Sequence, residues 1–250
     1  MQNYLKAQAP APDEGGRSGP TVAARRLFLR YSGAGLAVGG LWLAGCRKDT
    51  DGYAGGGLVD VGADDTGVLN YAYALEQLEA AFYAQVVAGG YFNKAETEAA
   101  EKAILSDLKD HEAVHAAFLK NVLGSAALQD LTPDFSHIDF SQRTTAANSS
   151  KLGVLNAAMF FEDLGVAAYN GVARYIKSAE TLAIVGKIVS VEARHAATIR
   201  ELLTANSFVA SDVVDTTTSG QEKSKRPPVV LAAVNAFLAS SSQLSASKIR

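Results

Sequence analysis

The stretch ILSDLKDHEAVHAAFLKNVL, residues 104–123, decides the fold, because it places two polar side chains on the apolar face of a helix. With about 100° of rotation per residue, Leu105 and Leu119 lie about 20° to either side of Glu112. His115 lies about 60° away on the same face. A buried carboxylate without a partner costs several kcal/mol, so the chain must offer one. The stretch therefore predicts a helix with a buried Glu and His, for which a metal ion is the obvious partner.

A second helical stretch repeats this pattern closer to the C-terminus. Val185 lies about 20° from Glu192, and Ile199 lies about 20° from it on the other side. His195 again lies about 60° away. A single Glu-x-x-His is a weak signal, because helices are rich in Glu and such pairs usually face solvent. Two copies on apolar faces form a much stronger one.

Two further helical segments each place one glutamate, Glu76 or Glu162, among apolar residues on the inward face. A tyrosine follows each glutamate seven positions later, which gives Tyr83 and Tyr169. Each tyrosine is interpreted either as a core residue with a satisfied hydroxyl or as a hydrogen-bond donor to a metal ligand. The order along the chain is therefore Glu, Glu-x-x-His, Glu, Glu-x-x-His.

This order, over residues 69–203, resembles that of the ferritin-like superfamily of di-iron and di-manganese carboxylate proteins. More narrowly, the chain resembles bacterial ferritin-like domain proteins related to desiccation-associated proteins. The resemblance implies an all-α, up-down four-helix bundle with a long crossover between helices 2 and 3 and a short extra C-terminal helix. It also implies two iron or two manganese ions, with Glu112 and Glu192 bridging them. The implied ligands are Glu76, Glu112, His115, Glu162, Glu192 and His195. Four carboxylates balance the charge of two divalent cations, but this ligand set does not choose between iron and manganese.

Two neighbouring residues have open roles. Glu79 lies about 60° from Glu76 and is either an additional ligand or a residue at the edge of the stripe that reaches solvent. His111 is either a residue at the edge of its stripe or a hydrogen-bond partner of a metal ligand.

The segment 111–115 also matches the H-E-x-x-H motif of zinc proteases, in which both histidines bind zinc. That interpretation needs a third ligand further along, yet Phe118 and Asn121 stand where the longer metzincin motif has Gly and His. It also leaves Glu192 and His195 unexplained. The zinc protease is therefore only a remote alternative.

The periodic segments predict five helices, separated by turns and by a crossover at 125–149 with a short extended piece near 135–140. Asn93 with Glu96 has capping-box spacing, which predicts that the second helix begins at Asn93. The expected helices span 65–88, 93–123, 151–176, 178–205 and 229–238.

The N-terminal region predicts export. Arg25 and Arg26 resemble a twin-arginine signal, although Ala24 departs from the Ser or Thr that more often precedes the pair. The apolar run 31–45 suits a signal peptide core, and Cys46 ends a sequence that resembles a lipobox. The alternative for Cys46 is a free thiol. We therefore expect a signal at 1–46, a flexible tether at 47–66, the bundle at 67–206 and a C-terminal extension with a short helix at 207–250.

Charge and composition restrict the function further. The chain has a formal net charge of −3, and residues 1–45 hold five basic and two acidic side chains, so their removal would leave −6. An acidic domain is a poor candidate for nucleic acid binding. The expected protein is a membrane-anchored lipoprotein on the periplasmic or cell-surface side, with dioxygen or peroxide as substrate and a role in oxidative or desiccation stress.

Ferroxidase, peroxidase and manganese-catalase-like reactions are all compatible with the ligand set. Iron storage and a structural stress protein stapled by its metal are the alternatives, and homo-oligomer formation stays open.

Overall fold

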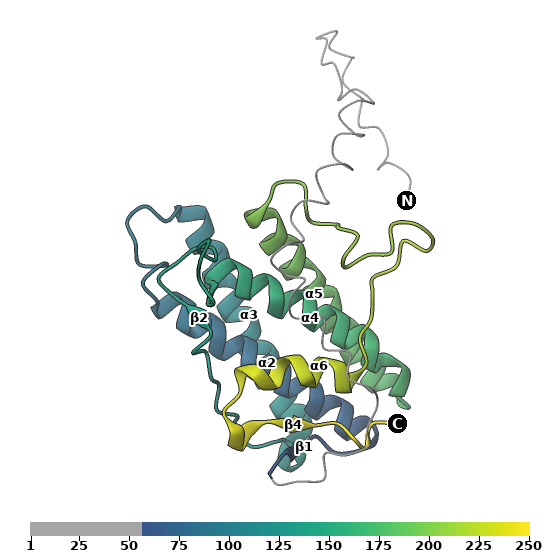
Figure 1. The fold of residues 1–250 in the computed structure, drawn as a ribbon. Coiled ribbons are helices and arrows are strands. Elements are labelled where there is room, and N and C mark those ends of the chain that lie inside the picture. Colours follow the sequence, from purple (N-terminus) through teal and green to yellow (C-terminus); the bar gives the residue numbers. More distant parts are fainter. Residues whose placement is uncertain (1–56) are drawn as a thin grey trace, which may run out of the picture. The chain divides into compact units, whose positions relative to one another are not determined.

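The computed structural model describes residues 57–250, which form an all-α bundle (Figure 1). Helix α2 packs mainly against α3, and α4 packs mainly against α5. The long helices are α2 (Asp64–Ala88), α3 (Ala99–Leu123), α4 (Val154–Val172) and α5 (Ala179–Leu203), and the short C-terminal helix is α6 (Pro227–Val234). The all-α four-helix fold with an added C-terminal helix is therefore confirmed.

Short strands fasten the connections around the bundle. Strand β1 (Val59–Asp60), which precedes α2, pairs in parallel with β4 (Leu244–Ser245) near the C-terminus. Strand β2 (Ile138–Asp139) pairs in parallel with β3 (Leu152–Gly153), directly before α4. The extended piece expected in the crossover is thus present, and it anchors the start of α4. Single 3-10 turns follow or link the helices at Gly124–Ala126, Ala173–Tyr175, Asn235–Phe237 and Ser240–Ser242.

The predicted start of the second helix was wrong. Helix α3 begins at Ala99, six residues after Asn93. The Asn93 side chain donates to the carbonyls of Val87 and Gly89, so it closes the end of α2 instead of capping α3. Asn favours such local bonds to the backbone in turns as much as it favours helix caps, and sequence spacing alone does not separate the two.

The start of α2 also depends on a distant contact. Asp65 was expected to cap this helix, but it lies inside α2 and accepts hydrogen bonds from the backbone N–H groups of Lys177 and Ser178. Ser178 in turn caps α5, as expected, by accepting from Glu180 and Thr181. One aspartate therefore joins the start of α2 to the start of α5.

The C-terminal region covers one seam of the bundle. Helix α6 begins at Pro227, two residues earlier than predicted, and ends at Val234. Figure 1 shows α6, in yellow, running across the front of the bundle. Val234 lines a small cavity together with residues of α2 and α4, so α6 closes the groove between these helices.

A buried ion pair holds the segment between α5 and α6. Arg200 on α5, which is buried, bonds to Asp163 on α4 and to Asp212 in the connecting segment. The backbone N–H of Lys225 then donates to the carbonyl of Ala167 on α4. The long polar connection therefore follows the surface of α4.

The predicted export signal with Arg25 and Arg26, the lipidation site Cys46 and the first part of the tether lie outside the described residues. Within residues 57–250, no helix has both the length and the apolar character that a bilayer span requires.

Candidate metal centre

Each long helix delivers one buried glutamate to the middle of the bundle, and α3 and α5 each add a histidine one turn later. All four glutamates are fully buried, and His195 is 5% exposed. The His115 side chain is 15% exposed. These residues are Glu76, Glu112, His115, Glu162, Glu192 and His195, the six that the sequence singled out.

The first cluster forms around the Nδ1 atom of His115. This atom lies 2.9 Å from an oxygen of Glu192, 3.3 Å from one of Glu76 and 3.4 Å from one of Glu112. One potential ligand atom from each of the four residues lies within 4.8 Å of all the others.

The second cluster forms around the Nδ1 atom of His195. It lies 2.7 Å from an oxygen of Glu112 and 3.6 Å from one oxygen each of Glu162 and Glu192. These four residues satisfy the same 4.8 Å condition. Three helices contribute to each cluster, so neither exists until the bundle has formed.

Glu112 and Glu192 belong to both clusters, and each divides its two oxygens between them. Glu112 turns Oε2 toward His115 and Oε1 toward His195. Glu192 turns Oε1 toward His115 and Oε2 toward His195. This is the arrangement required of two carboxylates that span a pair of metal positions, whereas Glu76 and Glu162 each serve one position.

Two tyrosines hold the unshared glutamates from the opposite helix. The Tyr83 hydroxyl on α2 donates to Oε1 of Glu162 on α4, and the Tyr169 hydroxyl on α4 donates to Oε1 of Glu76 on α2. Each tyrosine occupies one oxygen of its glutamate and leaves Oε2 facing the cluster. Of the two interpretations of these tyrosines, donation to a candidate ligand is the one that the geometry supports.

The donor atoms that face the centre have no hydrogen-bond partner. The close approaches within the clusters do not have hydrogen-bond geometry, and the unpaired buried atoms are Oε2 of Glu76 and Glu162, both oxygens of Glu112 and Glu192, and Nδ1 of both histidines. Buried polar atoms are rarely left unpaired in folded proteins. Six carboxylate oxygens and two imidazole nitrogens converging on one volume are the donor set that suits iron, manganese or zinc. The residues present therefore fit a metal pair.

The electrostatics of the metal-free cluster show the cost of this arrangement. Burial, followed by repulsion from Glu192, raises the pKa of Glu76, and burial with repulsion from Glu112 raises that of Glu162. Burial alone would lower the pKa of the histidines, but contacts with the carboxylates raise it to about 12 for His115 and about 10 for His195. Burial opposes ionisation of Glu112 as well, yet the two imidazoles lower its pKa to about 2. Without a cation, the cluster therefore holds protons to offset its negative charge.

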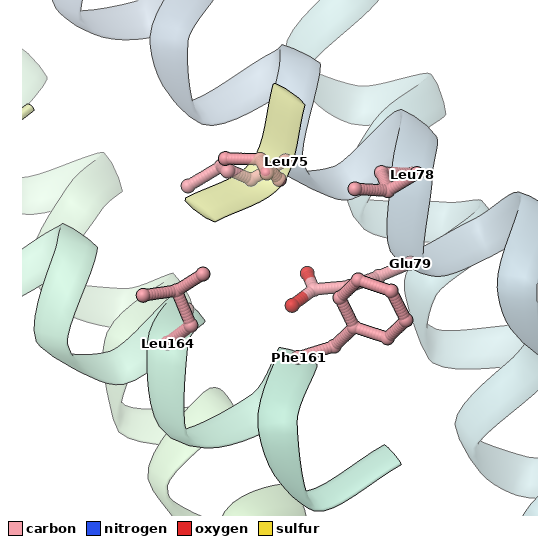
Figure 2. A pocket seen from close by; sticks show the side chains of 7 residues that line it. Leu75, Leu78, Glu79, Phe161 and Leu164 are labelled. Atoms are coloured by element: carbon pink, nitrogen blue, oxygen red, sulfur yellow. The ribbon is translucent and has the colours of Figure 1, made fainter. Parts of the chain in front are cut away.

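Glu79 is buried at 3% exposure, which corrects the interpretation that it reaches solvent, but it belongs to neither cluster. Figure 2 shows its carboxylate among Leu75, Leu78, Phe161 and Leu164, at a cavity of about 10 Å³. The pKa of Glu79 is raised by burial and then by Glu192.

Space for this carboxylate comes from α4. A Cβ atom at Gly165 would lie 3.0 Å from Oε1 of Glu79. The signal was present in the sequence, because Gly165 stands three residues after Glu162 just as Glu79 stands three residues after Glu76. The pairing became visible only when α2 and α4 were packed together.

His111 is exposed and belongs to neither cluster, but its Nδ1 atom lies 2.9 Å from Nε2 of His195. The two rings stack with their centroids 5.2 Å apart. The H-E-x-x-H zinc site requires His111 and His115 to face one metal, and among the described residues they do not share a cluster. His111 is instead the partner of a candidate ligand.

Comparisons with known proteins agree with this geometry. No curated protein matches the chain. A family model described as a ferritin-like domain matches residues 64–205, which covers α2 to α5 and all six cluster residues. Because the match spans more than half of the 250 residues, the chain belongs to the ferritin-like domain family.

Proposed function

We propose that this protein binds a pair of iron or manganese ions and carries out redox chemistry with dioxygen or peroxide. The observation that carries the proposal is the set of unpaired donor atoms divided between two clusters that share Glu112 and Glu192. A purely structural core would bury apolar side chains there, because unpaired buried carboxylates are costly.

The residues have distinct roles in this proposal. His115 and Glu76 would hold one metal ion, and His195 and Glu162 the other. Glu112 and Glu192 would hold both. When bound, such a metal pair supplies electrons to, or takes them from, dioxygen or peroxide.

The protein itself orients the ligands and excludes bulk water. Tyr83 and Tyr169 hold the carboxylates of Glu162 and Glu76 from outside, and thereby fix which oxygen faces the centre. His115, which is the more exposed of the two histidines, marks the side on which solvent and small molecules come closest to the cluster.

Export and anchoring form a separate part of the proposal. The pattern at Arg25, Arg26 and Cys46 supports export by the twin-arginine route and attachment of lipid at the cysteine. That route moves folded proteins, so the metal pair would be acquired before export. A role against oxidative or desiccation stress rests on the resemblance noted in the sequence.

The decisive experiment is elemental mass spectrometry on the full chain purified without chelators and then reloaded with Fe²⁺ or Mn²⁺. We expect two ions per chain. Glu112→Ala should lose both ions, because its oxygens face both imidazoles, whereas Glu76→Ala should weaken only one position. Asp110→Ala, at an exposed position on the same helix, is the matched control and should retain both.

Circular dichroism of each variant separates loss of metal from loss of fold. Full metal content in Glu112→Ala would contradict the ligand assignment. Oxidation of Fe²⁺ by dioxygen or peroxide, followed by absorbance, then tests the redox function. A protein that binds two ions but is inert to both oxidants would favour the metal-stapled structural alternative.

A further inference from the structure

We infer that His111 is a positioning residue that orients His195 and makes the two metal positions unequal. The inference rests on the proposed function, because it concerns how one ligand of the metal pair is held. It goes further by giving a role to a residue outside both clusters and by predicting which position binds metal more tightly.

The two nitrogens of His195 face different surroundings. Nδ1 points into the carboxylates of the second cluster, with Glu112 Oε1 at 2.7 Å. Nε2 points outward and meets Nδ1 of His111 at 2.9 Å. A nitrogen that accepts a metal cannot carry a proton, so when Nδ1 serves the metal the ring proton must reside on Nε2.

This requirement fixes the direction of the hydrogen bond. Nε2–H of His195 donates, and the unprotonated Nδ1 of His111 accepts. The remaining proton of His111 then resides on its Nε2. Metal-binding histidines commonly donate their second N–H to an acceptor that sets ring orientation and tautomer, and loss of such an acceptor lowers metal affinity by about 10–100-fold.

The first cluster lacks an equivalent partner. The two halves of the site correspond closely, since Tyr83 and Tyr169 exchange hydrogen bonds with Glu162 and Glu76 across the bundle. The residue that corresponds to His111, directly before the second Glu-x-x-His glutamate, is Val191. Valine has no side-chain acceptor, and no described residue forms a hydrogen bond with Nε2 of His115.

The consequence is a difference between the two positions. The His195 ring is held by stacking, by a hydrogen bond and by burial at 5% exposure. The His115 side chain is 15% exposed and lacks the outer hydrogen bond. We therefore expect the position of His195 and Glu162 to bind first and that of His115 and Glu76 to bind second.

The experiment compares two replacements of similar size in the full, metal-stripped chain. His111→Asn places a side-chain oxygen close to where Nδ1 lies, so it keeps an acceptor. His111→Leu has a similar shape without an acceptor. His137→Asn, which removes an exposed imidazole in the crossover, is the control. Mn²⁺ is titrated into each protein by isothermal calorimetry.

Two Mn²⁺ should bind to the unaltered chain in resolved steps. His111→Leu should weaken the tighter step by about 10–100-fold and leave the other nearly unchanged. His111→Asn should recover most of this loss, and His137→Asn should match the unaltered chain. A merely structural role for the ring would impair His111→Asn and His111→Leu alike.

A second measurement does not depend on affinity. In the Zn²⁺-loaded protein, which is diamagnetic, nuclear magnetic resonance should show a slowly exchanging imidazole N–H signal that persists in His111→Asn and disappears in His111→Leu. If the unaltered chain binds fewer than two ions, the proposed function fails. If it binds two and His111→Leu behaves identically in both measurements, only the role of His111 is overturned.

Discussion

At the scale of single residues, the site depends on which atom of each side chain is left without a partner. Tyr83 and Tyr169 occupy one oxygen of Glu162 and Glu76 and leave the other facing inward. Glu112 and Glu192 have both oxygens unpaired, and these two residues are shared between the clusters. Pairing of the outer atoms thus distinguishes the roles of otherwise similar glutamates.

Glu79 and Gly165 should be energetically coupled. Alanine is favoured over glycine in a helix by about 0.5–1 kcal/mol. In the unaltered chain, a Cβ at position 165 would press on the Glu79 carboxylate at 3.0 Å, so Gly165→Ala should gain little or should destabilise. In a Glu79→Ala background the same change should stabilise by about 0.5–1 kcal/mol.

Urea unfolding of the four proteins in this double-mutant cycle measures the coupling. All four should be compared free of metal, so that changes in metal affinity do not contribute. Equal effects of Gly165→Ala in the two backgrounds would show that the glycine does not make room for Glu79.

At the scale of secondary structure elements, glycines record where the connecting chain approaches a helix. A Cβ at Gly171 on α4 would lie 1.7 Å from the carbonyl oxygen of Lys225. The backbone at Lys225 is fixed there by its hydrogen bond to Ala167. The glycine therefore allows the segment before α6 to pack onto α4.

Gly171→Ala should displace this segment and destabilise the protein by about 1–3 kcal/mol, because backbone must move. Gly186→Ala on α5, where nothing lies within 4 Å of the added Cβ, is the matched control. It should stabilise by about 0.5–1 kcal/mol. Thermal unfolding and limited proteolysis near residues 207–226 would show both effects, and equal shifts in the two variants would contradict the packing argument.

The ends of the elements were predicted less well than their faces. The apolar stripes placed all six cluster residues correctly, because helical periodicity fixes which side chains share a face. The start of α3 was misplaced because Asn93 bonds to the end of the preceding helix. Asp65 likewise joins α5 instead of capping α2. Both polar side chains had alternative partners that only the packed chain provides.

At the scale of the whole molecule, the metal-free cluster should make stability depend on pH. The pKa of His195 is about 10 in the folded state, above the usual value of about 6.5. In this window the folded state keeps a proton that the unfolded chain has lost, so stability falls as pH rises. His115 acts in the same direction, since its pKa is raised to about 12.

The buried glutamates with raised pKa reinforce this trend, because they too hold protons in the folded state. Glu112 has the opposite sign, but its window lies between its usual value and about 2. We expect the metal-free protein to lose about 1 kcal/mol or more per pH unit between about pH 7 and about pH 10.

Urea unfolding across this range, with and without Mn²⁺, tests the prediction. The metal takes the place of the bound protons, so the loaded protein should be more stable and should not lose stability with rising pH in the same way. A metal-free protein with the same stability from about pH 7 to about pH 10 would show that the cluster does not hold these protons.

The sequence by itself determined the helical fold and the six residues that would meet, because a period of 3.6 places Glu and His on apolar faces whatever the other helices do. It also contained the two-fold repeat of Glu and Glu-x-x-His. Only the tertiary structure decided how the outer atoms are paired: the tyrosines cross between α2 and α4, Glu79 fills the space at Gly165, and His111 meets His195. The physical reason is that these contacts join different helices, and periodicity along one helix gives the direction of a side chain but not its partner on another.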